Sequence, residues 1–126
     1  MKTASDPRHI ARIKTMQALF AYDFHDKKEH KDKNVSSVVK HIKKIDKLIA
    51  KSAPAFPVDK IAKVDLAVLR LAVYELTVSK KAPPKVVIDE AVEMAKEFGG
   101  DSSSAFVNGV LGSVLEKGES YGNKNH

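Results

Sequence analysis

Apolar residues recur every three to four positions along most of the chain, and this period constrains the fold more than any other feature. The stripes are Ile13, Met16, Phe20 and Phe24; Val35, Val38, Ile42, Ile45 and Ile49; Leu66, Leu69, Val73 and Leu76; and Ile88, Ala91, Ala95 and Phe98. Such spacing places apolar side chains on one face of an α-helix. No run alternates apolar and polar residues long enough to predict a strand. The chain therefore predicts an all-α fold, most economically a helical bundle.

Prolines, glycines and capping residues predict where five helices begin and end. The predicted helices span about residues 7–24, 35–52, 61–79, 85–98 and 102–117. Between and after them lie a mobile charged connector at 25–34, a turn at 53–57 and a polar tail at 120–126. Asp6-Pro7 suits an N-cap followed by a first helical position, and Gly99-Gly100 suits a left-handed C-cap.

Length and composition exclude several classes of protein. The 126 residues fit a single domain. The absence of cysteine excludes disulfides and thiolate metal sites, and fits a reducing compartment. No apolar run approaches the roughly 20 residues of a membrane span, and we find no signal peptide, so we expect a cytoplasmic protein without membrane contact. The chain has no phosphate-binding Gly-Lys-Ser/Thr loop, zinc spacing or nucleophile elbow, so we expect no cofactor, metal or enzymatic activity.

Basic residues are concentrated in the first part of the chain. Residues 1–51 hold 13 Lys/Arg against 6 Asp/Glu, a net charge of +7, whereas residues 52–126 have a net charge of −1. This asymmetry favours a polyanionic partner, most simply nucleic acid. A solvated lysine face that improves solubility is the alternative.

The last predicted helix has glycines in its interior, although each costs about 1 kcal/mol relative to alanine. Ser102, Ala105, Gly109 and Gly112 follow at +3, +4 and +3 and form a face of small side chains. Such a face lets another backbone approach closely. We favour a neighbouring helix over a ligand there, and we expect Asn108, on another side, to make a buried polar contact.

Two long segments resemble the NusB family of bacterial transcription antitermination factors. They are VDKIAKVDLAVLRLAVYEL at 58–76 and PPKVVIDEAVEMAKEFGGDSSSAFVNGVLGSVLEK at 83–117. The opening RHIARIKTMQALFAYDF at 8–24 is similar to that family's arginine-rich motif and its Gln-Ala-Leu-Tyr signature. The chain departs from the family in a shorter stretch before Val58, and in Ile10, which interrupts the arginines.

The resemblance implies two small packed helical subdomains that share one core, with a shortened middle region, and no catalysis. We expect one domain over 1–126: a basic amino-terminal part at about 1–52, a carboxy-terminal part at about 58–117, and a polar tail at 118–126. The implied partners are boxA-type single-stranded RNA of ribosomal RNA leaders, the small-subunit ribosomal protein NusE, and the RNA polymerase antitermination complex.

Site residues follow from the matched positions. The resemblance implies that Arg8, His9 and Arg12 hold RNA phosphates, with help from Lys14, since the planar guanidinium pairs well with phosphate oxygens. Phe20 and Phe106 are the expected base-stacking residues, although core packing is favoured for Phe20. The expected NusE surface comprises Asp65, Arg70, Tyr74 and Glu75, because exposed acidic residues there suit a basic protein.

Other hypotheses stay open beside RNA binding. A protein-only helical adaptor would keep the NusE surface and lack specific RNA binding. The carboxylates Asp89, Glu90, Glu93 and Glu97 are expected to form a solvated face; a basic-protein docking surface and a hydrolase site are the alternatives. A homodimer that covers the Arg8 region would make RNA binding conditional.

Overall fold

The regular structure is helical throughout the residues that the computed structural model describes, which are 6–24 and 32–124, with side chains for 6–23 and 32–117. Its elements are α1 (Pro7–Phe24), α2 (Lys33–Lys40), α3 (Ile42–Ser52), the 3₁₀ turn η1 (Val58–Lys60), α4 (Lys63–Tyr74), the π-helical turn η2 (Glu75–Ser79), α5 (Pro84–Phe98) and α6 (Ser103–Lys124). The all-α prediction is confirmed. The expected mobile connector lies outside the described residues at 25–31, and its last residues begin α2.

Helix α4 forms the centre of the bundle. Every residue from Asp65 to Val73 is buried, and the helix contacts α1, α3, α5 and α6. A helix that carries apolar residues on every side must be covered on every side. One continuous core results, to which α1, α2, α3, α5 and α6 all contribute buried side chains.

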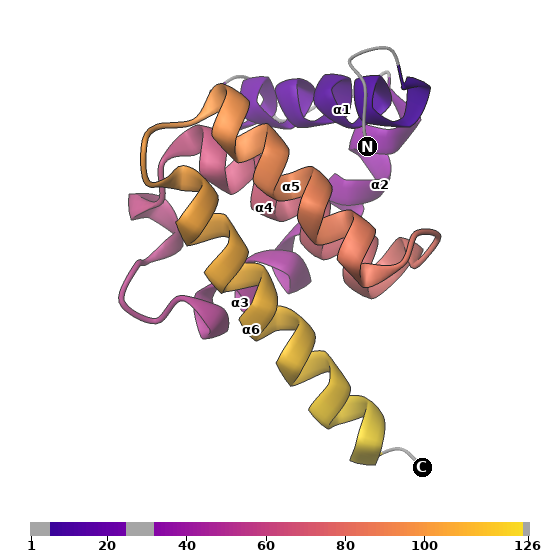
Figure 1. Cartoon of the computed structure of the whole chain (residues 1–126), viewed down its shortest axis with the longest axis vertical. Helices are drawn as coiled ribbons and strands as arrows, with labels where there is room; N and C mark the ends of the chain where they lie inside the picture. The colour runs from indigo at the N-terminus through magenta and orange to yellow at the C-terminus, as the bar shows by residue number, and fades with distance from the viewer. Residues whose placement is uncertain (1–5, 25–31, 125–126) are drawn as a thin grey trace.

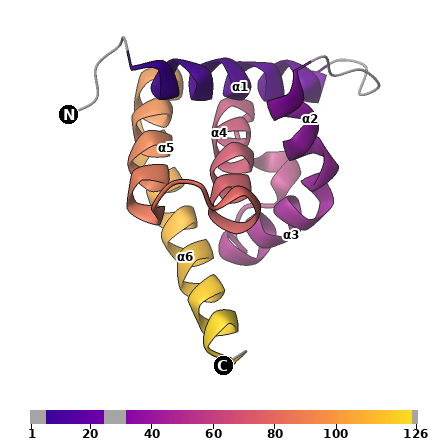
Figure 2. The ribbon, with the colours of Figure 1, turned by 90° about the vertical axis from the view of Figure 1, so that its right-hand side faces the viewer.

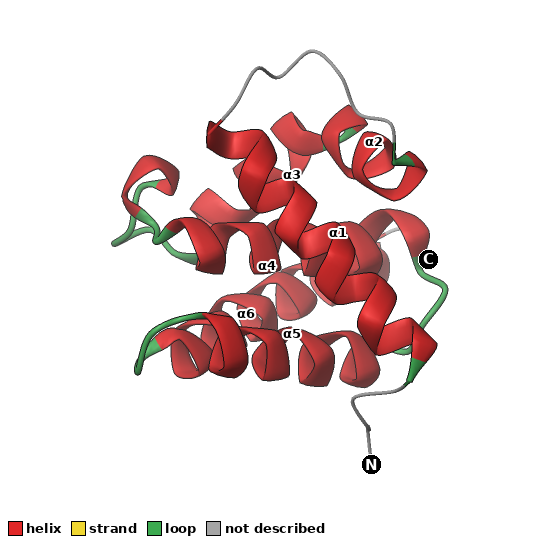
Figure 3. Ribbon diagram, turned by 90° about the horizontal axis from the view of Figure 1, so that it is seen from above, coloured by secondary structure: helices red, strands yellow, loops and turns green. Residues whose placement is uncertain are grey.

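The other helices surround α4 in a simple arrangement. Helix α1 lies across one end of the bundle, while α5 and α6 flank α4 on one side and α2 and α3 on the other (Figure 2). Seen from above, α1 crosses over the helices beneath it (Figure 3). The last turns of α6 project beyond the bundle (Figure 1).

The predicted single helix at 35–52 is wrong, because the chain breaks at His41 into α2 and α3. The His41 ring Nδ1 lies 2.9 Å from the Ser37 carbonyl oxygen, the acceptor that the His41 N–H would use in a continuous helix. That N–H donates instead to the Val38 carbonyl at 3.0 Å. The side chain therefore competes with the backbone and interrupts the helix, while Val35, Val38, Ile45 and Ile49 still face the core.

Two predictions about the ends of α5 and α6 are wrong. Gly99 is extended, with φ −96° and ψ −162°, so the expected left-handed C-cap is wrong. A Cβ on Gly99 would overlap Ser103 Oγ and lie 2.7 Å from the Ala95 carbonyl oxygen, so close approach is what requires glycine. Helix α6 also continues to Lys124, beyond the end expected at Lys117, so the predicted polar tail is helical over most of its length.

Candidate nucleic-acid interface

The first turn of α1 presents an exposed cation, Arg8, to solvent. Asp6 caps the helix as predicted, since its Oδ1 accepts the Arg8 N–H at 2.9 Å. This bond is the main reason that the pKa of Asp6 is lowered. The Arg8 side chain is 84% exposed, and its Nε lies 3.5 Å from the Asp6 carboxylate. Arg8 is therefore available to a phosphate.

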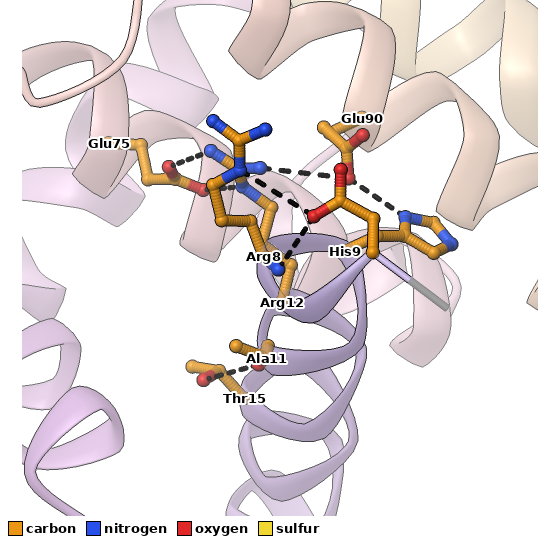
Figure 4. Close-up of polar contacts among 8 residues, drawn as sticks. Arg8, His9, Ala11, Arg12, Thr15, Glu75 and Glu90 are labelled. Carbon is orange, nitrogen blue, oxygen red and sulfur yellow. Dashed lines mark hydrogen bonds and ion pairs between the residues drawn. The ribbon is translucent and has the colours of Figure 1, made fainter. Parts of the chain in front are cut away.

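Arg12, one turn further along, is already bound inside the protein. Its Nε and Nη2 donate to the two carboxylate oxygens of Glu75 at 2.9 Å each, and its Nη1 lies 3.7 Å from Glu90 (Figure 4). The hydrogen bonds that Arg12 donates to Glu75 raise the pKa of Arg12. Paired bonds of this kind occupy the guanidinium edge that would otherwise bind a phosphate.

His9 belongs to the same cluster. Its Nδ1 lies 2.8 Å from Glu90 Oε1, and the two side chains are 11% and 4% exposed. The cluster of His9, Arg12, Glu75 and Glu90 therefore joins α1 to η2 and α5 (Figure 4). We call these four residues the anchor cluster. Its geometry indicates that His9 and Arg12 position the start of α1.

The anchor cluster forms the floor of an open groove between α1 and α5. Arg8, Lys81 and the beginning of α6 at Ser104, Ala105 and Asn108 line its rim. So do three carboxylates of α5 that repeat at four-residue intervals, Asp89, Glu93 and Glu97. The groove thus mixes exposed cations with an acidic edge.

The small-residue face of α6 is open. A Cβ added to Gly109 or Gly112 would meet no atom within 4 Å. The favoured prediction that a helix packs there is therefore wrong within the described residues, and Asn108, expected in a buried contact, is exposed. Because helical period predicts which faces are apolar but not what covers the others, sequence could not decide between the alternatives.

The two predicted stacking residues occupy different environments. Phe20 is half-buried and packs against the core, as its favoured alternative predicts. Phe106 is also half-buried and makes an edge-to-face contact with Phe56, with ring centroids 5.1 Å apart. Phe56 is 50% exposed in the turn between Pro54 and Pro57. Sequence reasoning missed Phe56, although an aromatic residue between turn prolines is a signal for an exposed ring.

The remaining predicted cation, Lys14, is exposed on α1. It lies six residues from Arg8, which corresponds to about 9 Å along a helix. Both cations are exposed, although at 3.6 residues per turn they point in directions about 120° apart around α1, whereas His9 and Arg12 are directed into the anchor cluster.

The predicted partner residues do not form one exposed patch. Asp65 and Arg70 are each 7% exposed, so the expectation of exposed acidic groups is wrong at Asp65. The Arg70 Nε and Nη2 donate to Asp46 at 2.9 Å each, and its Nη1 donates to Asp23 at 3.1 Å. Burial alone would lower the pKa of Arg70, but these bonds outweigh it and raise the pKa.

The other two predicted partner residues line the groove. Tyr74 is half-buried, with its ring centroid 6.0 Å from that of His41. Glu75 is half-buried and belongs to the anchor cluster. The structure therefore separates the four residues into an internal pair, Asp65 and Arg70, and a groove pair, Tyr74 and Glu75.

Two further features of the described residues bear on function. No group of three or more His, Asp or Glu side chains there could hold a metal ion. None of the helices in this part of the chain is both long and apolar enough to cross a membrane.

Comparison with known proteins identifies relatives over nearly the whole chain. The transcription antitermination protein NusB of Herpetosiphon aurantiacus is 41% identical over 141 aligned positions, which cover 94% of this chain and 97% of the relative. The protein of the same name from Bacillus velezensis is 38% identical, covering 85% of this chain and 94% of the relative.

Solved structures agree with these relatives. NusB of T. maritima superimposes with a TM-score of 0.78 at 32% identity, covering 92% of this chain and 93% of that one. A structure of antitermination factors NusB and NusE in complex with dsRNA gives 0.75 at 27% identity, covering 87% and 96%. The NusB family model matches residues 24–116. On sequence and fold together, the chain belongs to the NusB family.

Proposed function

We propose that this protein is a transcription antitermination factor that binds boxA-type single-stranded RNA together with a NusE-type ribosomal protein. One observation carries the proposal: the groove between α1 and α5 combines the exposed Arg8 with the open beginning of α6. The names of the relatives support it, as does the structural neighbour in which NusB and NusE are in complex with dsRNA.

Within this proposal the RNA contacts divide by their chemistry. Arg8 and Lys14 hold phosphates, because their charged groups are exposed on α1. Phe106 and Phe56 offer aromatic surface at the side of α6, where a base can stack. Gly109 and Gly112 leave room for the RNA backbone. His9 and Arg12 position this surface through the anchor cluster, and Phe20 supports it from the core.

The ribosomal protein is proposed to use the acidic part of the groove. Tyr74 and Glu75 lie in it, and Asp89, Glu93 and Glu97 add negative charge along α5. A basic protein surface complements such an edge. Asp65 and Arg70 support this region from inside. The pair would act in the RNA polymerase antitermination complex, in the cytoplasm, by binding and without catalysis.

The proposal is tested by fluorescence anisotropy of a labelled boxA RNA and a scrambled RNA, with and without the NusE-type protein. We expect preference for boxA that increases with the protein. Arg8→Ala should weaken boxA binding about tenfold, equivalent to ~1.4 kcal/mol, as expected for a charged hydrogen bond. For this variant the salt slope, which is the slope of log K against log[salt], should be about 0.7 smaller in magnitude, because one phosphate contact is lost.

The matched control is Lys85→Ala, which removes one exposed cation from α5. It should leave boxA affinity within twofold of the unmodified protein. Equal affinity for boxA and scrambled RNA in the unmodified protein, with or without the ribosomal protein, would exclude the proposed function.

A protein-only adaptor is the second candidate, favoured by the internal binding of His9 and Arg12 and by the acidic edge of α5. Two of the expected phosphate ligands are thereby withdrawn from RNA. An adaptor would bind the ribosomal protein with the same affinity whether boxA RNA is present or absent, and isothermal titration calorimetry in both conditions separates the two candidates.

A further inference from the structure

The solvent side of α2 and α3 is rich in lysine ammonium groups. The two helices direct Val35, Val38, Ile45 and Ile49 into the core. The opposite side exposes the lysines, which are Lys33, Lys40, Lys43, Lys44, Lys47 and Lys51. We call these six residues the lysine face. Lys44, Lys47 and Lys51 follow at +3 and +4, which aligns them along α3 at intervals of about 5 Å.

The carboxylates of these helices do not neutralise the lysine face. Only two acidic residues occur between positions 32 and 52. Asp32 caps α2, accepting the Asn34 N–H at 2.7 Å, and Asp46 is bound to Arg70. Among the described residues, no lysine of the face forms an ion pair. The positive charge of the face is therefore directed to solvent.

The lysine face and the acidic edge of α5 lie on opposite sides of the molecule. Figure 2 shows α5 on one side of α4 and α2–α3 on the other, with α1 spanning the distance between them. The α2–α3 side is thus electrostatically more favourable for a polyanion than the carboxylates of α5 are. Helix α1 begins near α5 and ends beside α2 (Figure 2). Because Arg8 is in the first turn of α1, RNA held there can continue along the helix toward the lysine face.

We propose that the lysine face is a second RNA-binding surface, which holds phosphates outside the segment bound at the α1–α5 groove and does so without regard to sequence. This inference rests on the proposed function and extends it. Lysine supplies a flexible point charge rather than the paired geometry of arginine. Phosphate contacts contribute affinity and position but carry no base information. The lysine face thus supplies affinity, while the groove supplies selectivity.

The test compares the double variant K44Q/K47Q with the unmodified protein, using two labelled RNAs of equal length, one containing boxA and one scrambled. Loss of two phosphate contacts should reduce the magnitude of the salt slope by up to about 1.4 for each RNA. At low salt, affinity for both RNAs should fall by the same factor, about fivefold or more, so that the boxA-to-scrambled ratio is unchanged.

The matched control is K85Q/K96Q, which removes two exposed lysines from α5. For either RNA, this control variant should change the affinity and the salt slope by less than half as much as K44Q/K47Q does. Circular dichroism and melting temperature establish that both variants are folded, as expected for substitutions at exposed positions.

Three results would overturn the inference: no loss in K44Q/K47Q, an equal loss in K85Q/K96Q, or a loss confined to boxA RNA. If the lysine face binds an acidic protein or a membrane instead of RNA, K44Q/K47Q should show no loss of RNA affinity. Failure of the proposed function is separate, because it is read from the boxA-to-scrambled ratio of the unmodified protein, whereas the lysine face is read from the loss of affinity for scrambled RNA.

Discussion

At the scale of single residues, Arg12 and Arg8 differ in role although they lie one turn apart on the same helix. Arg12 is bound by two carboxylates and its side chain is 14% exposed, whereas that of Arg8 is 84% exposed. Both are cations in a motif that resembles an RNA-binding one. Exposure and partners, rather than residue type, therefore separate the positioning residue from the phosphate ligand.

Removing Arg12 should lower the free energy of unfolding, because Arg12 holds the fold together rather than contacting RNA. Arg12→Ala leaves Glu75 and Glu90 close together without their shared cation. Loss of one partner of such a pair costs about 3 kcal/mol. Urea unfolding should show this decrease in the free energy of unfolding. Arg8→Ala, as the control, should lie within about 0.5 kcal/mol of the unmodified protein. Equal stabilities of the two variants would contradict the assignment of the anchor cluster.

At the scale of elements, the two helices of the carboxy-terminal part meet at a junction that depends on one of two adjacent glycines. Ser103 and the Ala95 carbonyl oxygen occupy the space that a Cβ on Gly99 would need. A Cβ on Gly100 would meet nothing within 4 Å. The Gly100 N–H also donates to Ser103 Oγ at 2.9 Å, which fixes the start of α6.

Gly99→Ala should therefore separate α5 from the start of α6. The added methyl group requires a shift of backbone as well as side chain, and overpacking of this kind costs about 1–3 kcal/mol. Thermal unfolding should show a lower melting temperature for Gly99→Ala. Gly100→Ala is the matched control and should change stability by no more than about 0.5 kcal/mol. Similar melting temperatures of the two variants would show that the junction tolerates the methyl group.

Gly109→Ala should have the opposite effect on stability. The site is in the interior of α6 and open, so alanine should stabilise the helix by about 0.5–1 kcal/mol. If the RNA backbone approaches this face, the same substitution should weaken boxA binding. A melting curve and an anisotropy titration on one preparation measure both effects. Greater stability with unchanged boxA affinity would place the RNA elsewhere.

At the scale of the whole molecule, a second ionic cluster joins the helices on the far side of α4. Asp23 of α1 pairs with Arg70 at 3.1 Å and with Lys63 at 2.7 Å, while Asp46 of α3 also binds Arg70. Burial raises the pKa of Asp23, but hydrogen bonds from Lys63 and Arg70 outweigh it, and the net effect is a lowered pKa.

This lowered pKa predicts how stability depends on pH. The folded state binds the Asp23 proton less tightly than the unfolded state, so Asp23 stabilises the fold above its ordinary pKa of 3.8. That stabilisation is lost as pH falls through the lowered value. Asp23→Asn should be less stable than the unmodified protein at pH 7, and the difference should narrow below pH 3.8.

Urea unfolding at several pH values measures this difference. Asp59→Asn, at an exposed position of η1, serves as the control for the change in charge. A gap between Asp23→Asn and the unmodified protein that stays constant through the acidic range would contradict the role of the ion pairs.

The sequence by itself determined the helical class, most element positions and the family. Local signals suffice for these properties: the 3.6-residue period selects the buried face, and Asp6-Pro7 specifies a helix start. The same signals also separated the basic and acidic parts of the chain. They failed at His41 and Gly99, where a side chain competes with the backbone or approaches it closely.

Only the tertiary structure decided which charged residues remain available to a partner. Arg12 binds Glu75, 63 residues away, and His9 binds Glu90, 81 residues away. Helical period orients side chains about their own axis but contains no information on which distant helix lies opposite. The same reason applies to the open face of α6 and to the lysine face, whose exposure depends on which helices pack beside them and which do not.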